Sequence, residues 1–168
     1  MKNRIFLIIN TIIFILFSSF LFAENLTIES KIVNFDKKNQ KTIFKNNVVL
    51  KTQRNETIKS QYAEYDKLKG LIILKEKVRF IDKQENIVET DYAEYFEDKE
   101  IFQSKGQSKI ITYNGYNVNG KNFILDNKKK ILTSENETVI EDPDKNILFL
   151  NNFEFLSKKN IFKSIGLI

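Results

Sequence analysis

The words Gln61-Tyr62-Ala63-Glu64-Tyr65 and Asp91-Tyr92-Ala93-Glu94-Tyr95 stand 30 residues apart in the sequence. The same spacing extends without gaps to five units, the last of them incomplete, which begin at Ile28, Ile58, Val88, Val118 and Leu148. One such unit is too small to bury its apolar face alone, whereas stacked units bury a continuous core together. The period therefore predicts one stacked array rather than several independent domains.

The local pattern inside each unit is that of β-strands. Short runs rich in Ile, Val, Phe, Tyr and Thr recur at Lys31–Phe35, Leu71–Leu74, Lys77–Ile81, Ile110–Tyr113 and Thr138–Ile140. Polar stretches such as Asp36–Asn39 and Asp66–Gly70 separate them, and no helical period follows Glu24. We expect an elongated all-β fold with two or three short strands per unit, in which residues 30 apart lie in register.

The first 23 residues have the features of a secretory signal peptide. Lys2 and Arg4 precede an apolar run over residues 5–22, and the small residue Ala23 is followed by polar sequence. The sequence therefore predicts a signal peptide over 1–23 and a mature domain over 24–168. An uncleaved membrane anchor is the alternative, and both place the domain outside the cytoplasm.

Composition excludes several kinds of chemistry. The chain has no Cys and no His, which removes disulfides, thiol nucleophiles, histidine acid–base pairs and the usual zinc sites. The acidic residues around Pro143 have the pattern of a turn rather than of a calcium site. Glu64 and Glu94 recur because the unit recurs, so they are a poor candidate for a catalytic carboxylate pair. We expect no enzyme activity, no cofactor, no metal and no nucleic-acid partner.

The unit resembles the OstA-like domain of the lipopolysaccharide-transport proteins, found in LptA, in LptC and in the N-terminal part of LptD. The resemblance covers about residues 25–168. It is carried by the pattern small-x-Tyr-Ala-Glu-Tyr, a polar turn, and strand endings of the Gly/Asn-x-Val type, here Asn46-Asn47-Val48, Glu76-Lys77-Val78 and Gly106-Gln107-Ser108. This chain departs from the family where Asn or Glu replaces the Gly, and where Ser108 and Thr138 replace the Val.

The resemblance implies an open, taco-like β-jellyroll in the periplasm, associated with the outer membrane. Its apolar groove would carry the acyl chains of lipopolysaccharide, and its edges would dock onto other Lpt jellyrolls. Lysines at the rim would meet head-group phosphates, although no single lysine stands out. The residues expected to line the groove are Ile28, Val33, Phe35, Leu50, Ile58, Tyr65, Ile72, Phe80, Tyr95, Phe102, Ile110, Phe123, Leu125 and Ile140.

Four identities stay open at this point. The sequence stops at Ile168, inside the fifth unit, which favours an N-terminal fragment of LptD. A stand-alone LptA-like bridge protein and a membrane-anchored LptC-like protein are alternatives. A structural β-repeat protein of the cell surface, without a lipid ligand, is the fourth, and a repeat-fold enzyme acting on polysaccharide has the least support.

Overall fold

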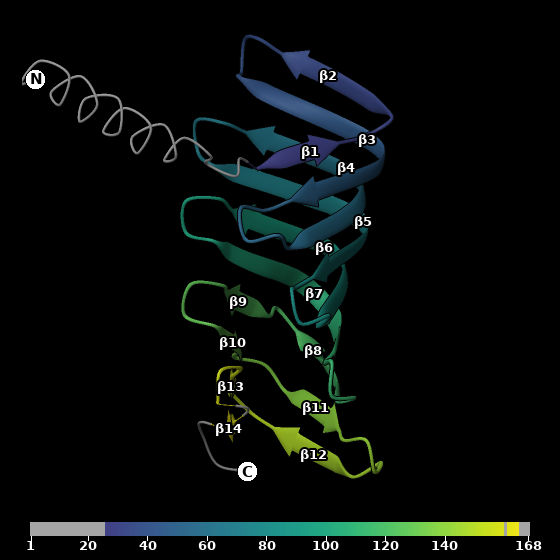
Figure 1. Ribbon diagram of the computed structural model, residues 1–168, viewed down its shortest axis with the longest axis vertical. Helices are drawn as coiled ribbons and strands as arrows, with labels where there is room; N and C mark the ends of the chain where they lie inside the picture. Colours follow the sequence, from purple (N-terminus) through teal and green to yellow (C-terminus); the bar gives the residue numbers. More distant parts are fainter. Residues whose placement is uncertain (1–25, 160, 165–168) are drawn as a thin grey trace, which may run out of the picture.

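The computed structural model describes residues 26–159 and 161–164, so the predicted signal peptide lies outside the described part. The described residues form one antiparallel sheet of 14 strands stacked along a single axis (Figure 1). No helix in the described residues is long and apolar enough to cross a membrane. The strands are β1 (Thr27–Glu29), β2 (Ile32–Asp36), β3 (Lys41–Lys51), β4 (Thr57–Asp66), β5 (Leu71–Ile81), β6 (Ile87–Phe96), β7 (Ile101–Ile111), β8 (Asn117–Lys121), β9 (Ile124–Asp126), β10 (Ile131–Ser134), β11 (Thr138–Glu141), β12 (Ile147–Leu150), β13 (Phe153–Leu156) and β14 (Ile161–Ser164).

The 30-residue unit corresponds to two long strands and two turns. Leu71–Leu74 and Lys77–Ile81, expected as two short strands, are the two halves of β5. The number of two strands per unit agrees with the prediction, but in this middle part the strands are long rather than short, because a bulge bends the strand without ending it. Towards the C-terminus the halves do separate, and β8 and β9 both pair with β7.

The bulges fold the sheet over on itself. The pairing register shifts between Lys45 and Val48, and again between Lys75 and Val78. The backbone there has positive φ, 63° at Asn46, 64° at Glu76 and 79° at Gly106. Asn and Gly adopt this conformation readily, whereas Glu does so at a cost. The three strand endings quoted from the sequence, at residues 46–48, 76–78 and 106–108, fall at these bends.

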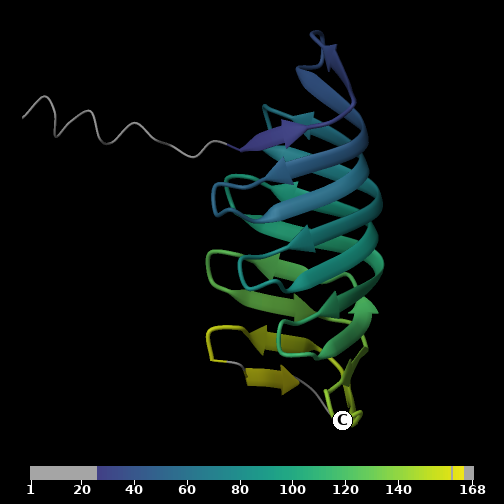
Figure 2. The same ribbon diagram turned by 45° about the vertical axis from the view of Figure 1, so that its right-hand side comes forward.

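The fold line divides the sheet into two leaves (Figure 2). Leaf A comprises the strand segments 32–36, 41–45, 62–66, 71–75, 92–96, 101–105, 124–126, 131–134, 153–156 and 161–164. Leaf B comprises 27–29, 48–51, 57–60, 78–81, 87–90, 107–111, 117–121, 138–141 and 147–150. The turns at the outer ends of the strands lie along the side opposite the fold, and those of leaf A form the left side of the stack in Figure 1.

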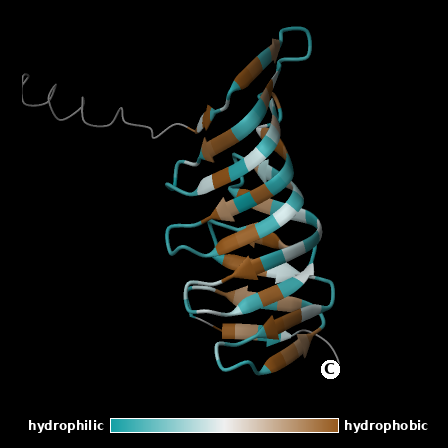
Figure 3. Cartoon of the chain, turned by 90° about the vertical axis from the view of Figure 1, so that its right-hand side faces the viewer, coloured by the Kyte–Doolittle hydropathy of each residue, from teal (hydrophilic) through white to brown (hydrophobic). Residues whose placement is uncertain are grey.

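Residues 30 apart share a row, as the repeat predicted. Tyr65 pairs with Ile72, Ile72 with Tyr95 and Tyr95 with Phe102. These four side chains therefore lie on the same face of leaf A, the face that is turned towards the interior between the leaves. Leaf B has an equivalent row through Ile58, Phe80, Val88 and Ile110. Apolar and polar residues alternate along the strands because one face is covered and the other meets solvent (Figure 3).

The turns are held by their own side chains. The Asp82 carboxylate accepts hydrogen bonds from the backbone N–H groups of Gln84 and Asn86, at 2.8 and 2.9 Å. Asp142, beside Pro143, accepts bonds from the backbone N–H and the side-chain Nδ2 of Asn146, both at 2.8 Å. Asp142, one of the two acidic residues that flank the proline, therefore shapes a turn, as the sequence pattern indicated.

Candidate functional site

The space between the leaves is the apolar interior of the molecule. Of the residues expected to line it, nine are buried: Leu50, Ile58, Ile72, Phe80, Tyr95, Phe102, Ile110, Phe123 and Ile140. Ile28, Tyr65 and Leu125 are partly buried and pack against that core. The structure thus brings twelve of the fourteen residues together.

Val33 and Phe35 are the two residues that the structure does not place in the packed interior. They are 56% and 61% exposed, although their neighbours in the sheet, Phe44 and Thr42, face inward. Both belong to β2, which pairs only with β3 in the described residues, so leaf A ends there. The sequence pattern gave their face correctly, but not their position at the end of the stack.

A narrow cleft of about 50 Å³ remains between the leaves in the C-terminal half. Its walls are mainly apolar and aromatic, and polar side chains stand at its mouth: Phe80, Asp82, Gln84, Asn86, Val88, Ile110, Thr112, Val118, Leu125, Asn127, Lys130, Leu132, Phe153, Phe155, Ser157 and Phe162. Pockets for small ligands usually have roughly 300–1,000 Å³. The leaves must therefore move apart before an apolar chain can enter.

Aromatic rings hold the leaves together beside this cleft. Phe80 of leaf B and Phe102 of leaf A have ring centroids 4.9 Å apart. Phe155 stacks on Phe162 at 4.4 Å, and Tyr116 lies 5.4 Å from Phe162. Phe155 and Phe162 were not expected among the lining residues, although each stands 30 residues after an apolar position of the preceding unit, Leu125 and Leu132, which was the signal for them.

Polar contacts join the two leaves at the open side. Glu56, in the turn after β3, is 1% exposed. Its Oε2 accepts hydrogen bonds from Thr52 Oγ1 at 3.0 Å and from Asn127 Nδ2 at 3.2 Å. Its Oε1 lies 3.6 Å from the Nζ of Lys130. Asn127 and Lys130 belong to the turn between β9 and β10, so this network spans from leaf B to leaf A.

Two further contacts reinforce the open side. Arg54, in the same turn as Glu56, forms an ion pair with Glu100 in the turn between β6 and β7. The Tyr65 hydroxyl donates a hydrogen bond of 2.8 Å to Glu97. Burial, followed by this bond, raises the pKa of Tyr65 to about 12, so the hydroxyl stays a donor at physiological pH. None of these polar residues except Tyr65 was expected from the sequence.

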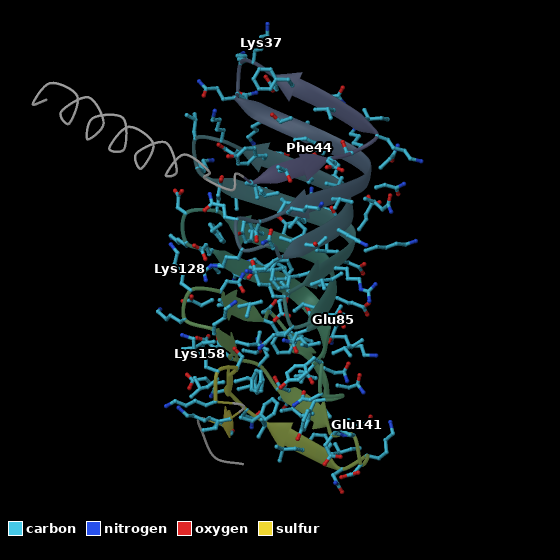
Figure 4. The ribbon with its side chains drawn as sticks, viewed as in Figure 1. Lys37, Phe44, Glu85, Lys128, Glu141 and Lys158 are labelled. Carbon is cyan, nitrogen blue, oxygen red and sulfur yellow. The ribbon has the colours of Figure 1, made fainter. Side chains whose placement is uncertain are left out.

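Burial also raises the pKa of Glu56, while the hydrogen bond from Thr52 and the charges of Lys130 and Arg54 oppose the rise. Among the described residues, Glu56 Oε1 is the one buried side-chain oxygen without a hydrogen-bond partner. Lys130 Nζ is near enough for attraction but not for a hydrogen bond. Figure 4 shows side chains filling the space between the leaves, with Lys128 labelled on the turn that also carries Lys130. No strand pairing joins the leaves on this side in the described residues, and a few side-chain contacts hold them together.

A single antiparallel sheet, folded over an apolar interior and unclosed along one side, defines an open β-jellyroll, the fold that the resemblance implied. A solved structure with this fold is that of LptH from Pseudomonas aeruginosa, described as the LptA homologous periplasmic component of the conserved lipopolysaccharide transport device. It matches with a TM-score of 0.57 and 15% identity, over 76% of this chain and 96% of the LptH chain. No protein-family model and no curated protein matches the sequence. The likeness to LptH shows a shared fold.

Proposed function

We propose that this chain is a non-enzymatic carrier module that binds the acyl chains of lipopolysaccharide between its leaves. It would pass the lipid through the periplasm for assembly at the outer membrane. The observation that carries the proposal is the aromatic cleft between two leaves whose open side is joined by a few side-chain contacts, polar ones at Glu56 and Arg54 and one between the rings of Tyr116 and Phe162. The fold shared with LptH, whose description names lipopolysaccharide transport, supports the same function.

The physical chemistry of the interior suits a carrier. Each methylene buried contributes about 0.8 kcal/mol, so a few acyl chains of moderate length bind firmly. An unclosed sheet widens by separating its leaves, which requires no strand pair to break. The lipid head group, which is costly to bury, remains in water beside the turns. Such a module holds a lipid and releases it again.

Leu125 and Ile124 provide the test of this function. They are neighbours on β9, but Leu125 lines the cleft whereas Ile124 faces outward and is 37% exposed. We expect Leu125→Asp to abolish photo-crosslinking to lipopolysaccharide, because the charge enters the apolar cleft, and Ile124→Asp to leave it unchanged. If folded Leu125→Asp protein crosslinks as well as the wild type, the cleft is not the lipid site, and a structural repeat protein becomes the better interpretation.

The ends of the stack support edge-to-edge docking as the way in which partners bind. In the described residues, β2 and β12 each pair on one side only. Both carry exposed apolar side chains: Ile32, Val33 and Phe35 on β2, and Ile147, Leu148 and Phe149 on β12. A free strand edge with apolar side chains invites pairing with another strand. We propose that other Lpt-type jellyrolls add to these edges, and Phe149→Lys should then weaken association measured by analytical ultracentrifugation.

The finer identity stays a prediction. An N-terminal domain of an LptD-type protein is the form that we propose, with a stand-alone LptA-like bridge or a membrane-anchored LptC-like protein as alternatives. Sequencing the reading frame beyond residue 168 distinguishes them. A following region of barrel size supports LptD, whereas a stop codon supports one of the other two. Fractionation of cells separates an anchored form from a released one.

A further inference from the structure

One pair of residues on the open side departs from the repeat. The positions equivalent to Glu56 in the later units are occupied by Asn86, Tyr116 and Asn146. Those equivalent to Lys130 in the earlier units are occupied by Glu100, Gly70 and Gln40. Repeat inheritance therefore does not explain why a buried carboxylate and a lysine face each other here. The pair must have a reason of its own in this chain.

The pair costs stability unless something offsets it. Taking a carboxylate out of water is expensive, and a buried ion pair often contributes less than apolar residues of similar size. Glu56 is almost fully buried, and its Oε1 has only the attraction of Lys130 at 3.6 Å. In some proteins, buried polar or charged groups are kept because they specify one arrangement of the structure over another.

Lys130 faces Glu56 and lines the cleft at the same time. Its side chain lines the mouth of the cleft beside Asn127 and Ser157, and it is 35% exposed to solvent. Its backbone is fixed, because its carbonyl accepts hydrogen bonds from the backbone N–H and the Oγ of Ser157, at 3.2 and 2.8 Å. The ammonium group can therefore reach either Glu56 or an anion in solvent, while the turn stays in place.

We propose that Glu56 and Lys130 form a latch on the groove, which opens when the anionic head group of an incoming amphiphile takes Lys130 from Glu56. The acyl chain then enters the cleft between the leaves. This inference rests on the proposed lipid-carrying function and adds to it the entry site and the chemistry of the head group. The class of ligand is an amphiphile with a phosphate-like anion next to its acyl chains.

The exchange follows from charge. A phosphate presents several oxygens to an ammonium group, and hydrogen bonds between two ions are roughly twice as strong as neutral ones. Once Lys130 has turned to the head group, Glu56 keeps only the bonds from Thr52 and Asn127. Arg54 is already paired with Glu100, and the negative charge of Asp82 repels that of Glu56. Only the Asn127 bond and the Arg54–Glu100 pair then hold the turn over residues 52–56 to leaf A, and the Glu56 carboxylate is more stable in water, so the turn separates from leaf A more easily.

The experiment compares two probes with the same acyl chain, dodecyl phosphate and dodecyl maltoside, in calorimetric titrations of the purified protein. We expect dodecyl phosphate to bind about ten-fold more tightly, the effect of one charge-assisted contact. Inorganic phosphate alone should not compete, because it has no chain to place in the cleft. In Lys130→Met the two probes should bind equally. Lys129→Met is the matched control, since Lys129 lies in the same turn but pairs locally with Asp126, and it should behave as the wild type.

A second measurement follows the opening itself. The chain has no cysteine, so spin labels attach only at introduced sites. Spin labels on Gln53→Cys and Lys129→Cys report the distance between the turn over residues 52–56 and the turn between β9 and β10, measured by pulsed electron paramagnetic resonance. We expect dodecyl phosphate to lengthen this distance in the wild-type background. Glu56→Gln should lengthen it without any probe, because the neutral amide does not attract Lys130.

The outcomes separate the latch from the proposed function. If neither acyl probe binds the wild-type protein, the carrier function fails and the latch fails with it. If both probes bind but Lys130→Met keeps the ten-fold ratio, or the label distance does not change, the latch is overturned and the carrier function stands. Should Lys130→Met not fold, the double variant Glu56→Gln/Lys130→Met, which leaves no unpaired buried charge, takes its place in the same comparison.

Discussion

Phe80 and Phe102 lie on opposite leaves of the folded sheet, and their rings meet across the interior with centroids 4.9 Å apart. Both side chains are 1% exposed. Phe80 belongs to the row that runs through leaf B and Phe102 to the row through leaf A. This contact therefore couples the two rows in the middle of the stack, next to the cleft.

Phe102→Ala should lower the free energy of unfolding by about 3–5 kcal/mol, because it removes a fully buried ring and leaves a cavity between the leaves. Urea unfolding followed by circular dichroism measures the change. Phe149→Ala is the control, since Phe149 is 66% exposed on β12. The control should change the free energy by less than about 0.5 kcal/mol. Equal losses in the two variants would contradict the closed contact between the leaves.

The fold line predicts a stabilising substitution. Glu76 has a φ of 64°, a conformation that costs a residue with a side chain about 1–2 kcal/mol and costs Gly much less. Glu76→Gly should therefore raise the midpoint of thermal unfolding, even though Gly usually weakens a strand. Lys75→Gly, one residue earlier and within the regular part of β5, should lower it. The idea of a strained bulge is wrong if both substitutions lower the midpoint.

A side chain at Gly120 should destabilise the protein through crowding. A Cβ placed there would lie 2.8 Å from Cζ of Phe123 and 3.1 Å from Oγ1 of Thr138. The ring of Phe123 is buried and cannot move freely, so Gly120→Ala should cost about 1–3 kcal/mol through overpacking. Gly106→Ala is an informative comparison, because a Cβ at Gly106 meets nothing within 4 Å and its cost comes from φ alone. Chemical denaturation of both variants, with the Gly120→Ala/Phe123→Leu double variant as a rescue, separates crowding from strain.

Glu56 should make stability depend on pH. Burial raises the pKa of its carboxyl, which faces Lys130, Arg54 and Asp82. A carboxyl with a higher pKa in the folded state binds its proton more tightly there, so the folded state loses stability as the pH rises through that pKa. We expect the unfolding free energy of the wild type to fall, relative to that of Glu56→Gln, as the pH rises above the ordinary pKa of a glutamate. Urea titrations of both proteins at several pH values measure the difference, and a difference that stays constant with pH would count against a raised pKa.

The sequence by itself determined the repeat, the strand faces and the positions of the turns. Tyr65 and Tyr95 share a face because side chains alternate along a strand and because both residues hold the same position in a unit that repeats the same turns and bulges. The polar stretch Asp66–Gly70 forms a turn because its residues favour one locally. These features depend on neighbours in the chain, so the pattern of residues is enough to predict them.

Only the tertiary structure decided how the leaves close. The approach of Glu56 to Asn127, 71 residues further along the chain, depends on the bend at each bulge and on the stacking of several units. The exposure of Phe35 and the narrowness of the cleft depend on where the stack ends and how closely the aromatic rings pack. A one-dimensional pattern specifies which face a side chain takes, but not the distance between two faces, because that distance is set by the packing of all the side chains between them.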